Sequence, residues 1–232
     1  VLLALLGMFV LWFFLSQQSR YLTSVVVPGA VLAAGAISRL KLGAVLGGLV
    51  VLQAAYSAWM LWTTQTTAQL DVVLGRVLTP AYQGQRIGFF DPATAINANT
   101  GVQKVALYDE VFGFLLDKPY FWANPGHSTL IPYEKLDSGA AFAEELKQQG
   151  FSHVYLNLQY MDPDARNRWL SAAGLAEGPP YGSEEREAMF ADPNLKWRWL
   201  IADAHRSGHL RIAQAFNRSF LFSIENPARV DR

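Results

Sequence analysis

The chain has 232 residues, of which 51% are hydrophobic and 16% charged, and its formal net charge is zero. The net charge is distributed unevenly along the chain. Residues 1–69 carry three cations and no acid, whereas the remainder carries 16 cations and 19 acids. The distribution predicts a membrane-embedded first third followed by one water-exposed domain. The absence of cysteine excludes disulfides, thiolate metal sites and cysteine nucleophiles. The slightly acidic second part argues against nucleic acid as a partner.

Three apolar runs, at about residues 1–15, 21–38 and 42–62, predict transmembrane helices within a membrane portion that covers residues 1–64. The first run is short for a hydrocarbon core of ~30 Å, so we expect the sequence to be the C-terminal piece of a longer protein. A signal peptide is the alternative, but the run has no basic leader and no small-residue cleavage site. Small residues in the later runs predict packing against the remaining transmembrane helices of that protein.

The charges between the second and third runs predict the orientation. Arg39 and Lys41 lie in a very short connection, which the positive-inside rule places in the cytoplasm. Arg20 and the domain at residues 70–232 then lie outside. The prediction is therefore a multi-pass protein of the inner membrane that contacts membrane lipids and carries an extracytoplasmic domain.

The second part of the chain has the pattern of a small α/β domain. Asp-Pro pairs supply a capping side chain followed by a proline that suits the first helical position, and glycines follow each candidate helix. A strand, a connection that contains a helix and then a second strand predict a parallel pair. The predicted helices cover residues 91–99, 138–150, 162–173 and 192–208, and the predicted strands cover residues 104–110, 152–159, 209–216 and 219–225.

Two acids follow the first predicted strand of this domain. Asp109 and Glu110 stand where open α/β sheets place functional loops. Adjacent carboxylates can bind a cation or serve as acid and base, but they also commonly cap the loop that follows a strand. Both interpretations remain open from the sequence.

The longest irregular stretch of the domain offers further candidates. Residues 121–129, FWANPGHST, include Trp122 and His127, which suit a functional loop. The alternative is that the aromatic side chains only pack the loop in place. No metal site is expected, because Gly208 is predicted to end the helix between His205 and His209. Without a glycine-rich phosphate loop, no cofactor is evident.

Arg20 lies in the sequence FFLSQQSRYLTSVVVPG, between two apolar runs. A lone arginine at a helix end commonly anchors to lipid headgroups. Arg20, however, falls on the side that the positive-inside rule disfavours for cations, which favours a specific anionic partner. The sequence leaves both interpretations open.

The order SQQSRYL, apolar helices and then an α/β domain resembles the C-terminal part of polytopic GT-C glycosyltransferases. The similarity is to the bacterial family 39 and aminoarabinose-transferase-like proteins, which use polyprenyl-phosphate sugars. The segments VVLGR, KVALYDE, FLLDKPYFWANPGHST and LKQQGFSHVYLNL also resemble the tails of bacterial members of this group.

The resemblance implies that Arg20 and Tyr21 contact the phosphate of a polyprenyl-phosphate-linked sugar, for which a guanidinium has suitable geometry. It also implies that the catalytic acid lies in a loop upstream of this sequence, so no catalytic residue is assigned here. Asp109, Glu110, Trp122 and His127 form the candidate acceptor loop. A membrane-anchored binding or assembly module without catalysis is the alternative function.

Overall fold

The computed structural model describes residues 7, 29–35, 43–127 and 129–225. The chain divides into two compact units, Val1–Thr79 and Pro80–Arg232. Each unit is described separately below.

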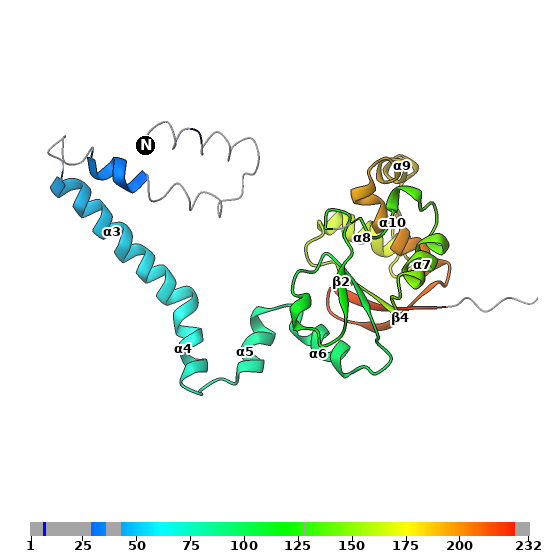
Figure 1. Ribbon diagram of the computed structural model, residues 1–232, viewed down its shortest axis with the longest axis horizontal. Helices are drawn as coiled ribbons and strands as arrows, with labels where there is room; N and C mark the ends of the chain where they lie inside the picture. The colour runs from blue at the N-terminus through cyan, green and yellow to red at the C-terminus, as the bar shows by residue number, and fades with distance from the viewer. Residues whose placement is uncertain (1–6, 8–28, 36–42, 128, 226–232) are drawn as a thin grey trace, which may run out of the picture. The chain divides into compact units, whose positions relative to one another are not determined.

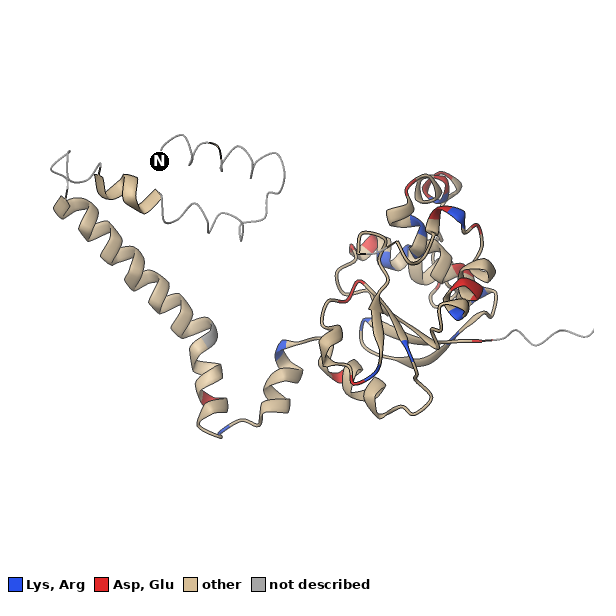
Figure 2. Ribbon diagram, in the orientation of Figure 1, with Lys and Arg blue, Asp and Glu red and all other residues tan. Residues whose placement is uncertain are grey.

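The first unit contains a long apolar helix. Helix α3 (Gly43–Leu61) continues through a π-helical turn (Trp62–Thr66) into α4 (Thr67–Val73). Figure 2 shows α3 without a charged residue, and the segment Gly43–Thr64 has a mean hydropathy of 1.6 and no residue buried inside the protein. At ~1.5 Å per residue such a segment is long enough to cross a hydrocarbon core.

The prediction of three transmembrane helices is wrong for the described part of the chain. There, Gly43–Thr64 is the one helix that is long and apolar enough to cross a membrane. Of the second predicted span, the structure describes residues 29–35, which are helical. The first predicted span lies outside the described residues except for Gly7.

The second unit is built on a mixed five-stranded sheet with the strand order β2-β1-β3-β5-β4. Strands β2, β1 and β3 are parallel, whereas β5 pairs antiparallel with both β3 and β4. The predicted parallel pair is confirmed as β1 and β3, and the small α/β domain is confirmed by this sheet and its helices. The strands are β1 (Val105–Tyr108), β2 (Tyr120–Trp122), β3 (His153–Asn157), β4 (Leu210–Ala215) and β5 (Ser219–Ile224).

Helices cover the sheet of the second unit (Figure 1). Side chains of α7, α8 and α10 pack with one face of the sheet, and α6 packs with the other face. The helices of this unit in the described residues are α5 (Thr79–Arg86), α6 (Phe90–Ala98), α7 (Gly139–Gln148), α8 (Pro163–Ala172), α9 (Ser183–Ala191) and α10 (Pro193–Arg206).

Local capping explains where most of these helices begin. The Asp162 carboxylate accepts hydrogen bonds from two backbone N–H groups at the start of α8, and Asp192 caps α10 in the same way with one. Asp91 does not cap α6 as predicted, because that helix begins at Phe90 with Phe89 at its N-cap. Burial of Phe89 in the core, where it is 1% exposed, fixes the earlier start.

The alternation of side chains along β1 divides the core. Ala106 and Tyr108 point to the face covered by α7 and α10, and Val105 and Leu107 point to the face covered by α6. Because β1, β2 and β3 are parallel, their carboxyl ends meet at one edge of the sheet. The loops that follow these ends contain the candidate residues of the domain.

Candidate functional site

Asp109 follows β1 directly and has an unusual backbone conformation. Its φ of +53° is the one positive value for a non-glycine residue in the described part of the chain. The Asp109 N–H donates to Asn124 Oδ1 at 2.8 Å, and Asn124 Nδ2 donates back to Asp109 Oδ1 at 2.9 Å. This reciprocal pair holds the left-handed conformation, and such strained residues cluster at functional sites.

Arg198 reaches the Asp109 carboxylate from α10. Its Nη2 lies 3.8 Å from Asp109 Oδ2, which is an ion pair but too long for a hydrogen bond. Its Nε is buried and has no hydrogen-bond partner among the described residues. The guanidinium also lies 5.3 Å from the centre of the Trp197 ring. A partly buried arginine with unused donors suits a polar or anionic ligand.

The environment of Asp109 raises the pKa of its carboxyl above the ordinary value of 3.8. Burial is the largest cause and disfavours the charged form, while Arg198 and the hydrogen bond from Asn124 act in the opposite direction. A carboxyl with a perturbed pKa in a cavity is typical of functional sites.

Glu110 has a different role from its neighbour. It is 3% exposed, and its Oε1 accepts from the backbone N–H groups of Val111 and Phe112 at 2.8 and 2.9 Å. Its Oε2 accepts from Asn157 Nδ2 at 2.9 Å. Both oxygens are therefore used to fix the loop after β1 and to tie it to the end of β3.

Trp122 and His127 belong to β2 and to the loop that follows it. Trp122 ends β2 and is 40% exposed, and its ring centre lies 6.3 Å from that of His127. The His127 N–H donates to the Asn124 carbonyl at 2.9 Å, which shapes the loop. The structure thus leaves a large part of the Trp122 surface open to a ligand.

These loops and α10 enclose a cavity of about 430 Å³ at the carboxyl ends of the parallel strands. It contains three of the residues singled out from the sequence, whereas Trp122 does not line it and lies beside His127, which does. Sequence reasoning missed Arg198 and Tyr160, since nothing local links them to Asp109. The residues that line it are Asp109, Glu110, Val111, Asn124, Gly126, His127, Tyr160 and Arg198.

Two other predictions concern a donor phosphate and a metal ion. Arg20 and Tyr21, the predicted contacts of a donor phosphate, lie outside the described residues. Within the described residues, no group of three or more His, Asp or Glu side chains could hold a metal ion.

Comparison with known proteins identifies no relative. No family model, no curated protein and no solved structure matches the chain. The function must therefore be argued from the residues themselves.

Proposed function

We propose that this chain is the C-terminal part of an integral-membrane glycosyltransferase that moves a sugar from a polyprenyl-phosphate donor to an extracytoplasmic acceptor. In this proposal, the cavity at Asp109 holds a saccharide, which is the acceptor. The observation that carries it is the convergence of Asp109, Asn124 and Arg198 beside the exposed ring of Trp122.

The chemistry of these side chains fits a sugar. A sugar ring presents hydroxyls that donate and accept, and a carboxylate, an amide and a guanidinium together offer both functions in planar groups. Its C–H faces pack against a flat aromatic surface, which an exposed tryptophan provides. A cavity of about 430 Å³ has room for a saccharide of this kind.

The apolar helix supports the membrane part of the proposal. Gly43–Thr64 is long and apolar enough to cross a bilayer, and the α/β unit follows it closely in the chain. A lipid-linked donor is available only to a protein at the membrane. The resemblance of SQQSRYL to the GT-C enzymes supplies the reaction class.

A non-catalytic binding module is the second candidate, and Glu110 favours it. Acid–base mechanisms at sugars commonly use two carboxyl groups, but both oxygens of Glu110 are occupied by structural hydrogen bonds. Asp109 alone then faces the ligand. The domain in this case recognises a saccharide without acting on it.

A glycan array probed with the full chain in nanodiscs tests the saccharide site. We expect binding that Trp122→Ala weakens about tenfold, because it removes a large aromatic contact. Phe114→Ala is the matched control, since Phe114 is 66% exposed and its ring pairs with Phe112, which does not line the cavity, whereas the Trp122 ring pairs with His127, which does. If no printed glycan binds, both candidate functions are wrong.

A transfer assay separates the two candidates. Proteoliposomes that contain the full-length protein receive a polyprenyl-phosphate sugar and the saccharide that binds best on the array. Transfer that Trp122→Ala impairs supports the glycosyltransferase. Binding without transfer, at protein levels that give full occupancy, supports the binding module.

A further inference from the structure

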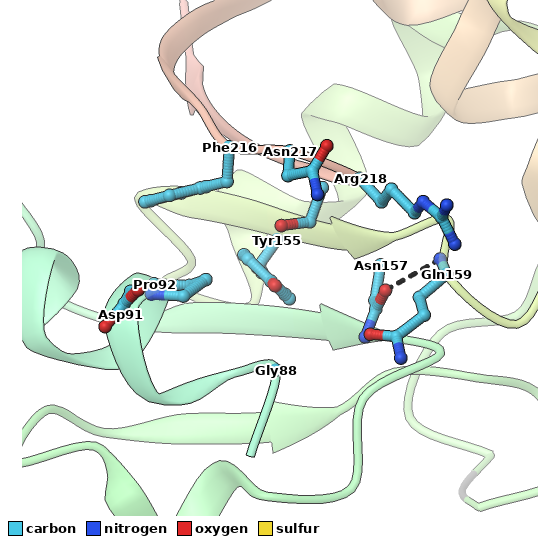
Figure 3. A pocket seen from close by; sticks show the side chains of 10 residues that line it. Gly88, Asp91, Pro92, Tyr155, Asn157, Gln159, Phe216, Asn217 and Arg218 are labelled. Carbon is cyan, nitrogen blue, oxygen red and sulfur yellow. Dashed lines mark hydrogen bonds between the residues drawn. The ribbon is translucent and has the colours of Figure 1, made fainter. Parts of the chain in front are cut away.

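A second cavity, of about 330 Å³, lies at the same end of the sheet. Tyr155 and Phe216 at this cavity belong to the side-chain cluster of the α6 face, whereas Arg198 of the first cavity belongs to α10 on the other face. Figure 3 shows the residues that line it, drawn from α6, the end of β3 and the hairpin between β4 and β5. This cavity has no role in the function proposed above.

Polar side chains converge on this second cavity. Asn157 is 4% exposed, its Oδ1 accepts from the Gln159 N–H at 2.8 Å, and its amide keeps a second N–H for a ligand. The Gln159 side chain lies over Gly88, where an added Cβ would stand 2.8 Å from Gln159 Oε1. The absence of a side chain at residue 88 therefore leaves room for this amide at the cavity.

The cavity also has a charged group of each sign and an aromatic surface. Asp91 and Arg218 line it and lie at opposite sides in Figure 3. Neither forms an ion pair with any described residue of the chain. Tyr155 is buried beneath them and Phe216 is partly buried, so a flat apolar surface lies beside the polar groups.

The two cavities offer the same set of functional groups. Each contains one aspartate, one arginine, at least one side-chain amide and at least one aromatic ring. Cavities with the same chemistry suit chemically similar ligand units. One ligand built from repeated units satisfies this condition.

The two cavities are also neighbours in the fold. Gln159 of the second cavity and Tyr160 of the first are consecutive in the chain. Glu110 of the first cavity accepts a hydrogen bond from Asn157 of the second at 2.9 Å. This buried hydrogen bond joins the ends of β1 and β3, so the two cavities lie on either side of it at this edge of the sheet.

We propose that the two cavities are subsites for one linear oligosaccharide, which runs across the carboxyl ends of β1 and β3. This inference rests on the proposed saccharide site at Asp109 and specifies its ligand as a chain of several sugar units. Trp122, Asp109 and Arg198 bind one part of the chain, and Gln159, Asn157 and Arg218 bind a part further along.

Graded saccharides test this arrangement. The full chain in nanodiscs is probed with an array that carries neutral, amino and acidic saccharide series of one to six units, and the best series is then titrated in solution. We expect the tetrasaccharide to bind at least about tenfold more tightly than the disaccharide, because only the longer chain fills both subsites. Gln159→Ala and Arg218→Ala should each lower the affinity for the tetrasaccharide about tenfold and the affinity for the disaccharide less than about twofold.

The controls come from the exposed edge strand of the same hairpin. Gln214→Ala and Arg211→Ala remove the same side-chain types from β4, outside both cavities, and should change neither affinity. Affinity that does not increase with saccharide length, or equal losses for short and long saccharides, overturns the two-subsite inference. That result leaves the proposed function intact, whereas an array with no binding at all contradicts the proposed function.

Discussion

Asp109 is the residue at which backbone strain, burial and ligand chemistry coincide. Its φ of +53° is tolerable because aspartate and asparagine enter the left-handed region more readily than most residues. The partly buried carboxyl has a raised pKa, so its charge costs folding free energy. Backbone strain and a partly buried charge at the same residue are typical of functional sites.

The raised pKa of Asp109 predicts a pH dependence of stability. The folded protein holds this proton more tightly than the unfolded chain, so the free energy of unfolding falls as pH rises from the ordinary value of 3.8 through the raised pKa. Asp109→Asn cannot ionise and suits the same backbone conformation. We expect the variant to gain stability relative to the wild type across this range, as measured by urea unfolding at stepped pH. Parallel stability curves for the two proteins would show that the pKa is not raised.

Glu110 should matter for stability more than for binding. Glu110→Ala leaves two backbone N–H groups of a partly buried loop, and the buried Asn157 amide, without their acceptor. We expect a loss of about 3 kcal/mol in the free energy of unfolding, measured by denaturant titration. Glu187→Ala, on the exposed surface of α9, is the control and should lie within about 0.5 kcal/mol of the wild type. A loss below about 1 kcal/mol would mean that the loop does not depend on this carboxylate.

Arg20 is the residue on which the donor part of the proposal depends. If it binds a donor phosphate, Arg20→Lys keeps the charge but loses the planar fork, and Arg20→Ala loses both. We expect roughly 30- to 1,000-fold slower transfer for Arg20→Ala and a smaller defect for Arg20→Lys. Transfer is measured at equal expression of the full-length protein. Near-normal rates for both variants would assign Arg20 to membrane anchoring.

At the scale of elements, α7 and α10 are in unusually close contact. The Gly139 N–H donates to Asp203 Oδ2 at 2.6 Å, and a Cβ at residue 139 would lie 2.1 Å from the Ala204 backbone nitrogen. Only glycine allows the first turn of α7 to lie directly on the backbone of α10. This contact contributes to the placement of α10, which carries Arg198 to the site.

Gly139→Ala should therefore destabilise the α/β unit. The clash is with backbone atoms, which cannot move aside as a flexible side chain can, so we expect a loss of about 3 kcal/mol or more. Gly126→Ala is the matched control, since its Cβ would meet nothing within 4 Å. Thermal unfolding followed by circular dichroism measures both variants. Similar melting temperatures for the two would contradict the close approach.

The elements differ in how far the sequence predicted them. Helices α8 and α10 were predictable because Asp162 and Asp192 cap them through local hydrogen bonds. Strand β2 was missed because its three residues are too few to show a period, and α9 was missed because it buries no residue. Arg198 was missed because its contact with Asp109 depends on how α10 packs, and no local pattern reports a tertiary contact of that kind.

At the scale of the whole molecule, the charges that precede the apolar helix predict its orientation in a membrane. Arg39 and Lys41 precede it on the side that the positive-inside rule assigns to the cytoplasm. We therefore expect alkaline phosphatase fused after Leu70 to be active in the periplasm. A green fluorescent protein fusion at the same position is the reciprocal control and should stay dark. Fluorescence there would reverse the orientation and separate the saccharide site from an exported lipid donor.

The order of the strands in the sheet has a consequence for synthesis of the chain. β5 is the last of the five strands in sequence, yet it lies between β3 and β4. Until β5 has left the ribosome, β3 presents one unpaired edge. The core also lacks Phe222 on one face of the sheet and Leu221 on the other. Nascent chains at this stage expose a strand edge that can pair with other chains. Folding of this domain should therefore depend on a chaperone that shields β3 until the β4–β5 hairpin arrives.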